Sequence, residues 1–593
     1  MEKFTAVAEV NDALLNDIDA LSAAVEQWNA NTALLEQWQK YADMLNDLTE
    51  CGLGEAVKMH RDGAGVNDIC NSFLAGYYKN KTNDIITADP TLKEFNGLMF
   101  EKQIERYTIL KREFQQLTLE ELTTKLAANI SIDTRDAELG SELTLLRKRI
   151  GNKGRGTSIR NIIDQMPNLL PRLCPVMLMS PLSVAQYIDV DAPKFDLVVF
   201  DEASQMPTSE AIGALARAKS AVVVGDPKQM PPTSFFSVNT SDDDTADIDD
   251  LESILDDCIS LSMPTRYLEW HYRSKHESLI TFCNQNFYEN RLVTFPSAND
   301  KVSQVSLQFV DGFYDYGKTR TNRAEAEAIA AEVIKRMDEQ PQRSIGVVAF
   351  SKQQSDLIED IISEELAKYP KLERQNIESE EPLFIKNLEN VQGDERDIIL
   401  FSVGYGPDKE GHVSMNFGPL NKVGGERRLN VALSRARYEM KIFSTLRPEQ
   451  IDERRTNAEG VLGLKRFLQF ARQECEVQNE AAAEEKNLII RQIASKLKDM
   501  GFEVKTSIGK SALKVDVAVV HPTNPERYIL GIICDGNSYY SLKTMRDREI
   551  VQPSVLRMLG WNLVHIWSID WLLHQDMILK QIVEKISTKN KLQ

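Results

Sequence analysis

Apolar and polar residues alternate in three different ways along this chain. From Val10 to about Leu126, apolar residues recur every three or four positions, as at Leu14, Ile18 and Leu21, which predicts a long helical region. After Pro175 the pattern changes to short apolar runs separated by helical stretches, which is typical of parallel α/β sheets. The predicted strands are VMLM (176–179), FDLVVF (195–200), AVVVGD (221–226), SIGVVAF (344–350) and DIILFSV (397–403).

A third pattern begins near Asn487. A helix over 488–500 precedes strand-like runs at 514–520 and 528–535, and the pattern closes with a helix over 550–559 and a strand over 562–567. This order predicts a separate C-terminal α/β domain, joined to the rest by a charged helical segment. A further stretch, 241–257, has six aspartates within nine residues and predicts a solvated loop.

The composition describes a multidomain globular chain. It has 593 residues, 42% apolar and 27% charged, and at roughly 150 residues per domain this length corresponds to about four compact units. No apolar run approaches the roughly 18 residues of a bilayer-spanning helix, and acidic residues stand where a signal peptide has its apolar core. We therefore expect a cytoplasmic protein with no membrane partner.

Cysteine spacing and net charge bear on which metal sites, disulfides and nucleic-acid surfaces this chain could have. The seven cysteines lie far apart with no CxxC, and the histidines form no metal-spaced cluster with them, so we expect neither a zinc site nor a disulfide framework. The net charge of −19 argues weakly against a surface that coats nucleic acid throughout. A local basic channel inside an acidic envelope remains compatible with it.

An acidic pair, Asp201-Glu202, ends the strand FDLVVF. Open α/β sheets bind ligands at the carboxyl ends of their strands, where one carboxylate holds Mg²⁺ and the other activates water. The alternative is a surface pair that opens a helix. A second strand weakens that alternative because its end, Gly225-Asp226-Pro227-Lys228-Gln229, reaches the same edge, where Gln229 would bond the γ-phosphate and the attacking water.

Two arginine clusters follow these strands. One is His271-Tyr272-Arg273-Ser274, after a loop, and the other lies between Arg428 and Arg437, on a helix predicted to begin near Glu426. Phosphoryl transfer requires cations on the developing charge of the γ-phosphate, and the guanidinium fork suits that task. Taken alone, each arginine is better explained as a surface salt-bridge partner.

Together and in this order, the motifs resemble those of superfamily 1 helicases, in particular the branch of the RNA-decay and Okazaki-processing helicases. The resemblance covers roughly residues 175–446. The matching motifs are FDEASQ (200–205) for motif II, VVVGDPKQMPP (222–232) for motif III, HYRS (271–274) for motif IV, VQGDERD (391–397) for motif V and RRLNVALSRAR (427–437) for motif VI.

The resemblance implies ATP and Mg²⁺ as cofactors and assigns roles to single residues. Asp201 would hold Mg²⁺, Glu202 would be the general base, and Gln229 would couple the γ-phosphate to motif III. Arg273 and Arg435 would act as arginine fingers from the second core domain. The remaining implied contacts are Gly225, Asp226, Gly393 and Glu395 with the nucleotide, Glu395 at its ribose, and Ser180, Pro181 and Ser183 as the strand-end contact with nucleic acid.

The phosphate-binding loop of the family is missing from these 593 residues. That loop, Walker A, reads GxxxxGK[ST], and no stretch fits it. The stretch from Gly151 to Ser158 has the glycine spacing, but Thr157 stands where the lysine belongs and a helical pattern precedes it; Gly509-Lys510-Ser511 lacks the upstream glycine. We expect a truncated or split helicase, with an upstream polypeptide that carries Walker A as a possible partner.

The C-terminal domain resembles the very-short-patch-repair branch of the PD-(D/E)xK nucleases. The segments that carry this resemblance are Val515-Asp516, the runs from Gly531 to Gly536 and from Thr544 to Arg548, and Leu559-Gly560-Trp561. It implies that Asp516 and Asp535 face each other across adjacent strands and share Mg²⁺. Family members usually have Glu two residues before the second aspartate, where this chain has Ile533, so a weak nuclease and a DNA-binding remnant both stay open.

These observations predict an α/β fold with two RecA-like parallel-sheet domains, an α-helical region before them and a small α/β restriction-endonuclease-like domain after them. The predicted function is ATP-driven translocation on nucleic acid, and the nuclease-like domain favours DNA. The alternatives are a non-catalytic nucleic-acid-binding remnant and a structure-specific endonuclease that uses the helicase fold as a clamp. The predicted divisions are 1–165 (helical insertion of the first motor domain), 166–262 (rest of that domain), 263–450 (second motor domain), 451–486 (linker) and 487–593 (nuclease-like domain).

Overall fold

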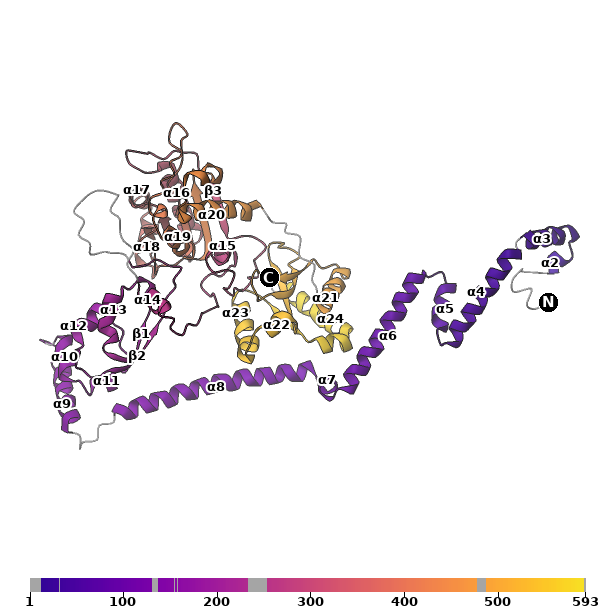
Figure 1. The fold of residues 1–593 in the computed structure, drawn as a ribbon, viewed down its shortest axis with the longest axis horizontal. Coiled ribbons are helices and arrows are strands. Elements are labelled where there is room, and N and C mark those ends of the chain that lie inside the picture. The colour runs from indigo at the N-terminus through magenta and orange to yellow at the C-terminus, as the bar shows by residue number, and fades with distance from the viewer. Residues whose placement is uncertain are drawn as a thin grey trace. The chain divides into compact units, whose positions relative to one another are not determined.

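The computed structural model describes residues 12–30, 32–130, 137–153, 155–156, 158–232, 253–476 and 487–590. It divides into two compact units, Met1–Asn96 and Gly97–Gln593, each of which is described by itself (Figure 1). Among the described helices, none combines the length and the apolarity that crossing a membrane requires.

The first unit is helical, as the periodicity of its apolar residues predicts. Its buried apolar residues in the described part are Leu45, Val57 and Ile86, so these helices have only a thin core. Asp89 caps the last of them because its side chain accepts hydrogen bonds from the N–H groups of Thr91 and Leu92. The helices are α2 (Asp12–Leu15), α3 (Ile18–Ala30), α4 (Thr32–Glu50), α5 (Gly54–Arg61), α6 (Val66–Ala88) and α7 (Pro90–Glu94).

The second unit begins with helices and a small parallel sheet. Strands β1 (Phe195–Phe200) and β2 (Ala218–Val223) pair in parallel, with Val199 opposite Val222. One face of this sheet packs on an apolar cluster that includes Phe200, Ala211 and Ile254. The helices here are α8 (Gly97–Ile130), α9 (Ala137–Gly151), α10 (Ile159–Gln165), α11 (Leu170–Leu173), α12 (Pro181–Tyr187), α13 (Thr208–Leu215) and α14 (Ile254–Ser260).

A five-stranded parallel sheet in the order β3-β7-β6-β4-β5 forms the next domain. Alternate residues of each strand point to opposite faces, so Val347 packs in one apolar cluster and Val348 in the other. Residues of α16, α17 and α18 form the first cluster, and residues of α15, α19 and α20 form the second, which makes three layers. The elements are α15 (Ser278–Phe287), β3 (Val305–Phe309), α16 (Arg323–Glu339), β4 (Ile345–Ala349), α17 (Lys352–Leu366), α18 (Pro370–Glu378), β5 (Phe384–Asn387), β6 (Arg396–Ser402), α19 (Gly425–Leu433), β7 (Ala436–Ser444) and α20 (Glu459–Glu476).

The C-terminal domain has a mixed sheet in the order β11-β10-β9-β8. One face packs against α21 and α24 through residues such as Val517, Ile532 and Trp571. The other face packs against a cluster that includes Leu556 and Trp561. The elements are α21 (Leu488–Asp499), β8 (Val504–Ile508), β9 (Val515–Val520), β10 (Tyr528–Cys534), α22 (Asn537–Ser541), α23 (Gln552–Met558), β11 (Leu563–Ile566) and α24 (Ser568–Asn590).

The α/β fold class is confirmed, and four local predictions are wrong. The VMLM run at 176–179 is not a strand, and the loop predicted over 241–257 becomes helical at Ile254; residues 241–252 lie outside the described part. The sequence prediction omitted β3, β5 and β7 of the five-stranded sheet and β8, α22 and α24 of the C-terminal domain. Arg435 and Arg437 are not on the predicted helix, because α19 ends at Leu433 and Arg437 lies in β7.

Candidate active site

The acidic pair lies just beyond the carboxyl end of β1, where both side chains are exposed. Glu202 has a φ of 53°, in the left-handed region that costs a residue with a Cβ some free energy. This turn lets the Glu202 N–H donate to Oδ1 of Asp201 at 3.0 Å, while Gln205 donates to Oε2 of Glu202 at 3.3 Å. The carboxylates are therefore oriented and accessible, and oxygen ligands of this kind suit Mg²⁺.

The loop after β2 lies directly against this turn. The Ala203 N–H donates to the Val224 carbonyl at 2.9 Å. A Cβ on Gly225 would stand 2.9 Å from the backbone nitrogen of Ser204, so only glycine permits this approach. Beyond it, Oδ2 of Asp226 accepts from the Gln229 amide at 3.1 Å, which fixes Gln229 beside the acidic turn.

Three side chains of the second sheet domain reach this loop. The Tyr288 hydroxyl donates to Oδ2 of Asp226 at 2.7 Å. Asn430 donates to the Tyr288 oxygen at 2.8 Å and to the Lys228 carbonyl at 2.9 Å, and Gln392 donates to Oε1 of Gln229 at 3.5 Å. The two sheet domains thus meet through hydrogen bonds at the end of β2.

The cross-domain contacts include residues that sequence analysis did not select. Asn430 and Gln392 lie inside the quoted motifs but had no assigned role, and Tyr288 follows α15 outside any motif. Burial and the charge of Asp226 raise the pKa of the Tyr288 hydroxyl, which keeps it a neutral donor. Among the described residues, Oδ1 of Asn430 and Oε1 of Gln392 are buried without a hydrogen-bond partner, which an occupied or rearranged cleft would relieve.

Arg273 and Glu395 form an ion pair, with 2.6 Å between Nε and Oε2. Burial opposes ionisation of Glu395, but the hydrogen bond and charge of Arg273, with the charge of Arg437, hold the pKa of Glu395 below its usual value. Arg437 also pairs with Asp397 and with Glu381. Its pKa is raised, first by the hydrogen bond to Glu381, so it remains charged.

Arg435 is almost completely buried, with 2% of its surface exposed. Its Nε donates to the Val431 carbonyl at 2.6 Å and Nη2 to the Ser434 hydroxyl at 3.2 Å. Burial, and then the charge of Arg273, lower the pKa of Arg435 to about 10, although the charges of Glu202 and Glu395 act in the opposite direction. Arg435 therefore lies within electrostatic range of the acidic turn, Arg273 and Glu395.

Two predicted contacts need a separate description. Gly393 is exposed and has a φ of 87°, which leaves the turn before Glu395 open to solvent. Ser180 to Ser183 do not follow a strand: Ser180 caps α12, and its hydroxyl accepts from the Ser183 N–H at 3.2 Å. The strand-end description of this segment is therefore wrong, because the preceding VMLM run pairs with no described strand.

In the C-terminal domain, the two aspartates have different partners. Asp516, in β9, accepts from the Cys534 N–H at 2.7 Å and from the Ser538 hydroxyl at 3.1 Å. Asp535, one residue beyond β10, accepts from the backbone and hydroxyl of Ser568. The described residues contain no group of three or more His, Cys, Asp or Glu side chains able to hold a metal ion.

Ile533 occupies an apolar environment. It lies in β10 opposite His565 of β11, is 5% exposed, and belongs to the cluster that contains Tyr528 and Trp561. Burial lowers the pKa of His565 to about 4 despite the charge of Asp535, so this histidine is neutral. Ile533 supplies no oxygen and the two aspartates have different partners, so these residues offer fewer oxygen ligands than a divalent cation takes.

Comparisons with known proteins cover both of the sheet domains that meet at this loop. Two family models, both described as AAA domains, match residues 177–237 and 251–447, which carry the two sides. An uncharacterised ATP-dependent helicase of Mycoplasma genitalium, MG140, is 31% identical over 465 residues that cover 70% of this chain and 39% of the relative. The central part of this chain is homologous to ATP-dependent helicases.

Further relatives extend the comparison. The MG140 homologue of Mycoplasma pneumoniae is 31% identical over 448 residues, again 70% of this chain and 39% of that protein. The mouse protein named 5'-3' DNA helicase ZGRF1 is 26% identical over 268 residues, 43% of this chain and 13% of that protein. The chain thus spans about two fifths of the length of the Mycoplasma helicases. Residues 490–586 match the model of a restriction-endonuclease-like domain, REase_MTES_1575.

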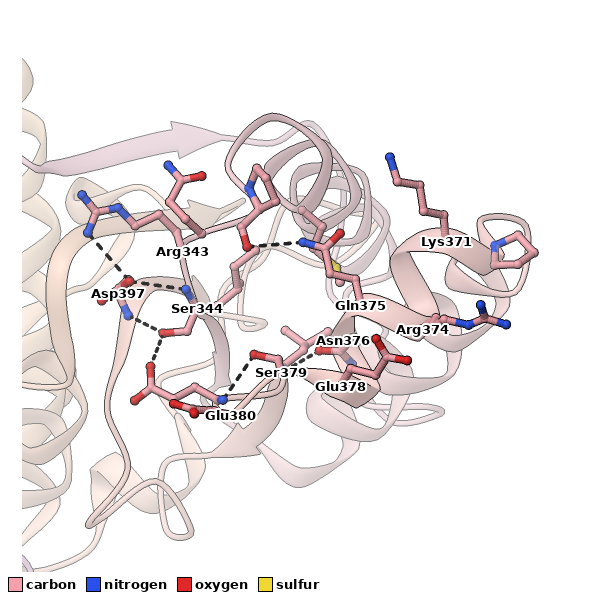
Figure 2. A pocket seen from close by; sticks show the side chains of 17 residues that line it. Arg343, Ser344, Lys371, Arg374, Gln375, Asn376, Glu378, Ser379, Glu380 and Asp397 are labelled. Carbon is pink, nitrogen blue, oxygen red and sulfur yellow. Dashed lines mark hydrogen bonds and ion pairs between the residues drawn. The ribbon is translucent and has the colours of Figure 1, made fainter.

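A polar pocket of about 870 Å³ lies beside the arginine network of this helicase-like core. Figure 2 shows Arg343, Ser344 and Asp397 on its wall, and Asp397 is also bonded to Arg437. The Ser344 hydroxyl donates to Glu381 at 2.7 Å, and the Asp397 N–H donates back to that hydroxyl at 3.1 Å. These polar atoms are bonded to one another, which supports a structural role: they hold the start of β4, β6 and β7 together.

Proposed function

We propose that this chain forms the nucleotide cleft of an ATP-dependent DNA helicase. The observation that carries the proposal is the convergence of Glu202, Gln229, Arg273 and Arg435 from two sheet domains. Acids on one side and arginines on the other are what hydrolysis of a γ-phosphate between two moving domains requires. The left-handed Glu202 supports it further, since such strain concentrates at functional sites.

Each residue then has a defined task. Asp201 would hold Mg²⁺, which would supply neutralising charge at the phosphates, and Glu202 would accept the proton of the attacking water. Arg273 and Arg435 stabilise the charge that develops on the γ-phosphate. Without nucleotide, Glu395 holds Arg273, and contact of Glu395 with the ribose would release that arginine toward the phosphates.

We propose that the phosphate-binding loop comes from a polypeptide segment outside these residues. Parallel sheets are normally covered on both faces, yet Leu197 (50% exposed), Val199 (55%) and Val222 (45%) lie open on one face of the β1–β2 sheet. A further parallel strand with GxxxxGK[ST] at its carboxyl end would pair at an edge of this sheet and bring the missing lysine to Glu202, and the helix that follows this loop would cover the open face. The greater length of the Mycoplasma helicases supports such a segment, on the same polypeptide or a separate one.

The proposed track is single-stranded DNA, read in the 5′ to 3′ direction. The name of the mouse relative supports both points. Ser180, Pro181 and Ser183 remain our candidates for the strand contact, now at the start of α12, where Leu178 (95% exposed) and Leu182 (76% exposed) provide apolar surface for bases. For the C-terminal domain we propose a DNA-binding role without cleavage, since Asp516, Asp535 and Ile533 do not fit a cation.

The test is ATP hydrolysis with single-stranded DNA. The chain alone should turn over ATP poorly, because the β- and γ-phosphates lack the lysine and the loop N–H donors. Addition of a Walker A segment taken from a full-length relative should restore turnover, and Glu202→Gln should then lower it by roughly 10²–10⁴-fold with nucleotide binding retained. Glu210→Gln, at an exposed carboxylate of α13, is the matched control. Restored turnover that survives Glu202→Gln would refute the assigned base.

A further inference from the structure

The C-terminal domain shares a hydrophobic core with the second sheet domain. Phe295 (7% exposed) and Ala298 (1% exposed) precede β3, yet they belong to the apolar cluster of Tyr528, Ile533 and Trp561. This cluster covers the face of the C-terminal sheet opposite α21 and α24. Part of the core of the C-terminal domain is therefore built from a segment more than 180 residues earlier in the chain.

Backbone hydrogen bonds hold this segment, residues 294–298, in place. The Ala298 N–H donates to the Leu559 carbonyl at 3.2 Å, and the Tyr528 N–H donates to the Ala298 carbonyl at 2.9 Å. The indole N–H of Trp561 donates to the Pro296 carbonyl at 2.8 Å. The Ser511 hydroxyl donates to the carbonyl of Thr294 and accepts from its N–H, at 2.8 and 3.0 Å. Buried bonds of this number fix both position and orientation.

The residues on either side of Arg273 contact this segment and the C-terminal domain. Trp270 packs on Phe295 with 5.3 Å between ring centroids. The His271 N–H donates to the Val293 carbonyl at 2.9 Å. On the other side of Arg273, buried Glu277 accepts from the Lys510 N–H of the C-terminal domain at 2.9 Å. The end of the Arg273 loop at Glu277 is thus bonded directly to the C-terminal domain. The end at Trp270 contacts that domain through Phe295.

We propose that the C-terminal domain is a brace for the Arg273 loop and moves with the second sheet domain as one rigid body. Docking depends on the shared core rather than on the chain connection through residues 477–486. The role of the brace in hydrolysis rests on the proposed function, but the docking and the ordering of the loop do not involve nucleotide.

Cleavage of the connection tests the docking. A protease site introduced into residues 477–486 of the full chain allows it to be cut after folding, and the two fragments should co-elute in size-exclusion chromatography. Ala298→Arg places a charged side chain in the shared core and should separate them. Asn299→Arg, one position away at an exposed residue, is the matched control and should leave them together. Separation of the unsubstituted fragments would overturn the proposal.

Hydrogen exchange of the uncut chain tests the brace. In Ala298→Arg the His271 amide should exchange at least tenfold faster than in the unsubstituted chain, and in Asn299→Arg it should not change. If Ala298→Arg fails to fold, Ser511→Ala gives the same test, because it removes only the hydroxyl that binds Thr294. Unchanged exchange at His271 in the folded variant would overturn the brace, whatever the result of the ATPase assay.

Discussion

Removal of the Tyr288 hydroxyl should loosen the contact between the two sheet domains. In Tyr288→Phe, Asp226 loses a donor at 2.7 Å, and Asn430 loses an acceptor at 2.8 Å but keeps the Lys228 carbonyl. A hydrogen bond to a charged group contributes about 1.5–3 kcal/mol, whereas that of the neutral Asn430 contributes less. Because Asp226 also accepts from Gln229, the loss should reach the side chain that we assign to the γ-phosphate.

Amide hydrogen exchange measures this loss. A change of about 1.5–3 kcal/mol in the opening free energy corresponds to roughly 10- to 150-fold faster exchange, at 1.36 kcal/mol per factor of ten. The amide to follow is Gln229, which donates to the Asp226 carbonyl at 3.0 Å. Tyr316→Phe, at a tyrosine that is 61% exposed, is the control and should have no effect. Exchange at Gln229 that is the same in Tyr288→Phe and the unsubstituted chain would refute the coupling.

Three further predictions concern the charged groups around the cleft and the C-terminal domain. Arg437→Ala should lower the free energy of unfolding by about 2 kcal/mol in chemical denaturation, since it leaves Glu381, Glu395 and Asp397 facing one another at a site that is only partly exposed. Burial, then the charge of Asp300, raises the pKa of Glu277 to about 7, so its ionisation lowers the free energy of unfolding as pH rises from the ordinary pKa of a glutamate through 7. The effect of Glu277→Gln on the free energy of unfolding should therefore be more favourable at pH 8 than at pH 5. An equal effect at both pH values would contradict that pKa. Incubated with plasmid and Mg²⁺, the unmodified protein should not nick DNA, and nicking that disappears in Asp516→Ala but not in Asp576→Ala, at an exposed aspartate, would show that two aspartates suffice.

The strands that the sequence predicted correctly are those that pair with a parallel neighbour. FDLVVF, SIGVVAF and DIILFSV each have a parallel neighbour to pair with, and their apolar residues predict this. The VMLM run is equally apolar, but Val176 and Leu178 are 77% and 95% exposed and no described strand pairs with them. Apolarity indicates a tendency to be buried, and pairing depends on a neighbour that a local pattern does not reveal.

Two of the elements that the sequence prediction missed, β8 and α24, lack a regular pattern of apolar and polar residues. β8 has the sequence VKTSI, and its polar residues Lys505, Thr506 and Ser507 interrupt the alternation of apolar and polar positions that indicates a strand. It is a strand because it pairs antiparallel with β9. α24 contains a kink at His574 that interrupts its helical period. In both cases tertiary contacts decide the structure rather than the intrinsic preference of the residues.

Some residues of the candidate site could be selected from the sequence, and others could be found only in the structure. Motif residues such as Asp201, Glu202 and Gln229 were selected because their order along the chain is specific. Tyr288 was not selected, because a tyrosine after an amphipathic helix is ordinarily explained by packing in the core. Only the fold shows that its hydroxyl donates to Asp226. Motif VI predicted the wrong local structure for its arginines, because α19 ends at Leu433 and Arg435 lies in the turn before β7.

In the C-terminal domain, the residues that carry the nuclease resemblance have partners of their own. A divalent cation takes six or more oxygen ligands, whereas Asp516 accepts hydrogen bonds from the Cys534 N–H and the Ser538 hydroxyl and Ile533 supplies no oxygen. Ile533 joins the core that Phe295 and Ala298 complete, so a carboxylate at position 533 would be buried in the surface by which this domain docks. We therefore propose that the departure from the nuclease pattern and the docking on the second sheet domain share one cause, because Ile533 lies on the face of this sheet that packs on Phe295 and Ala298.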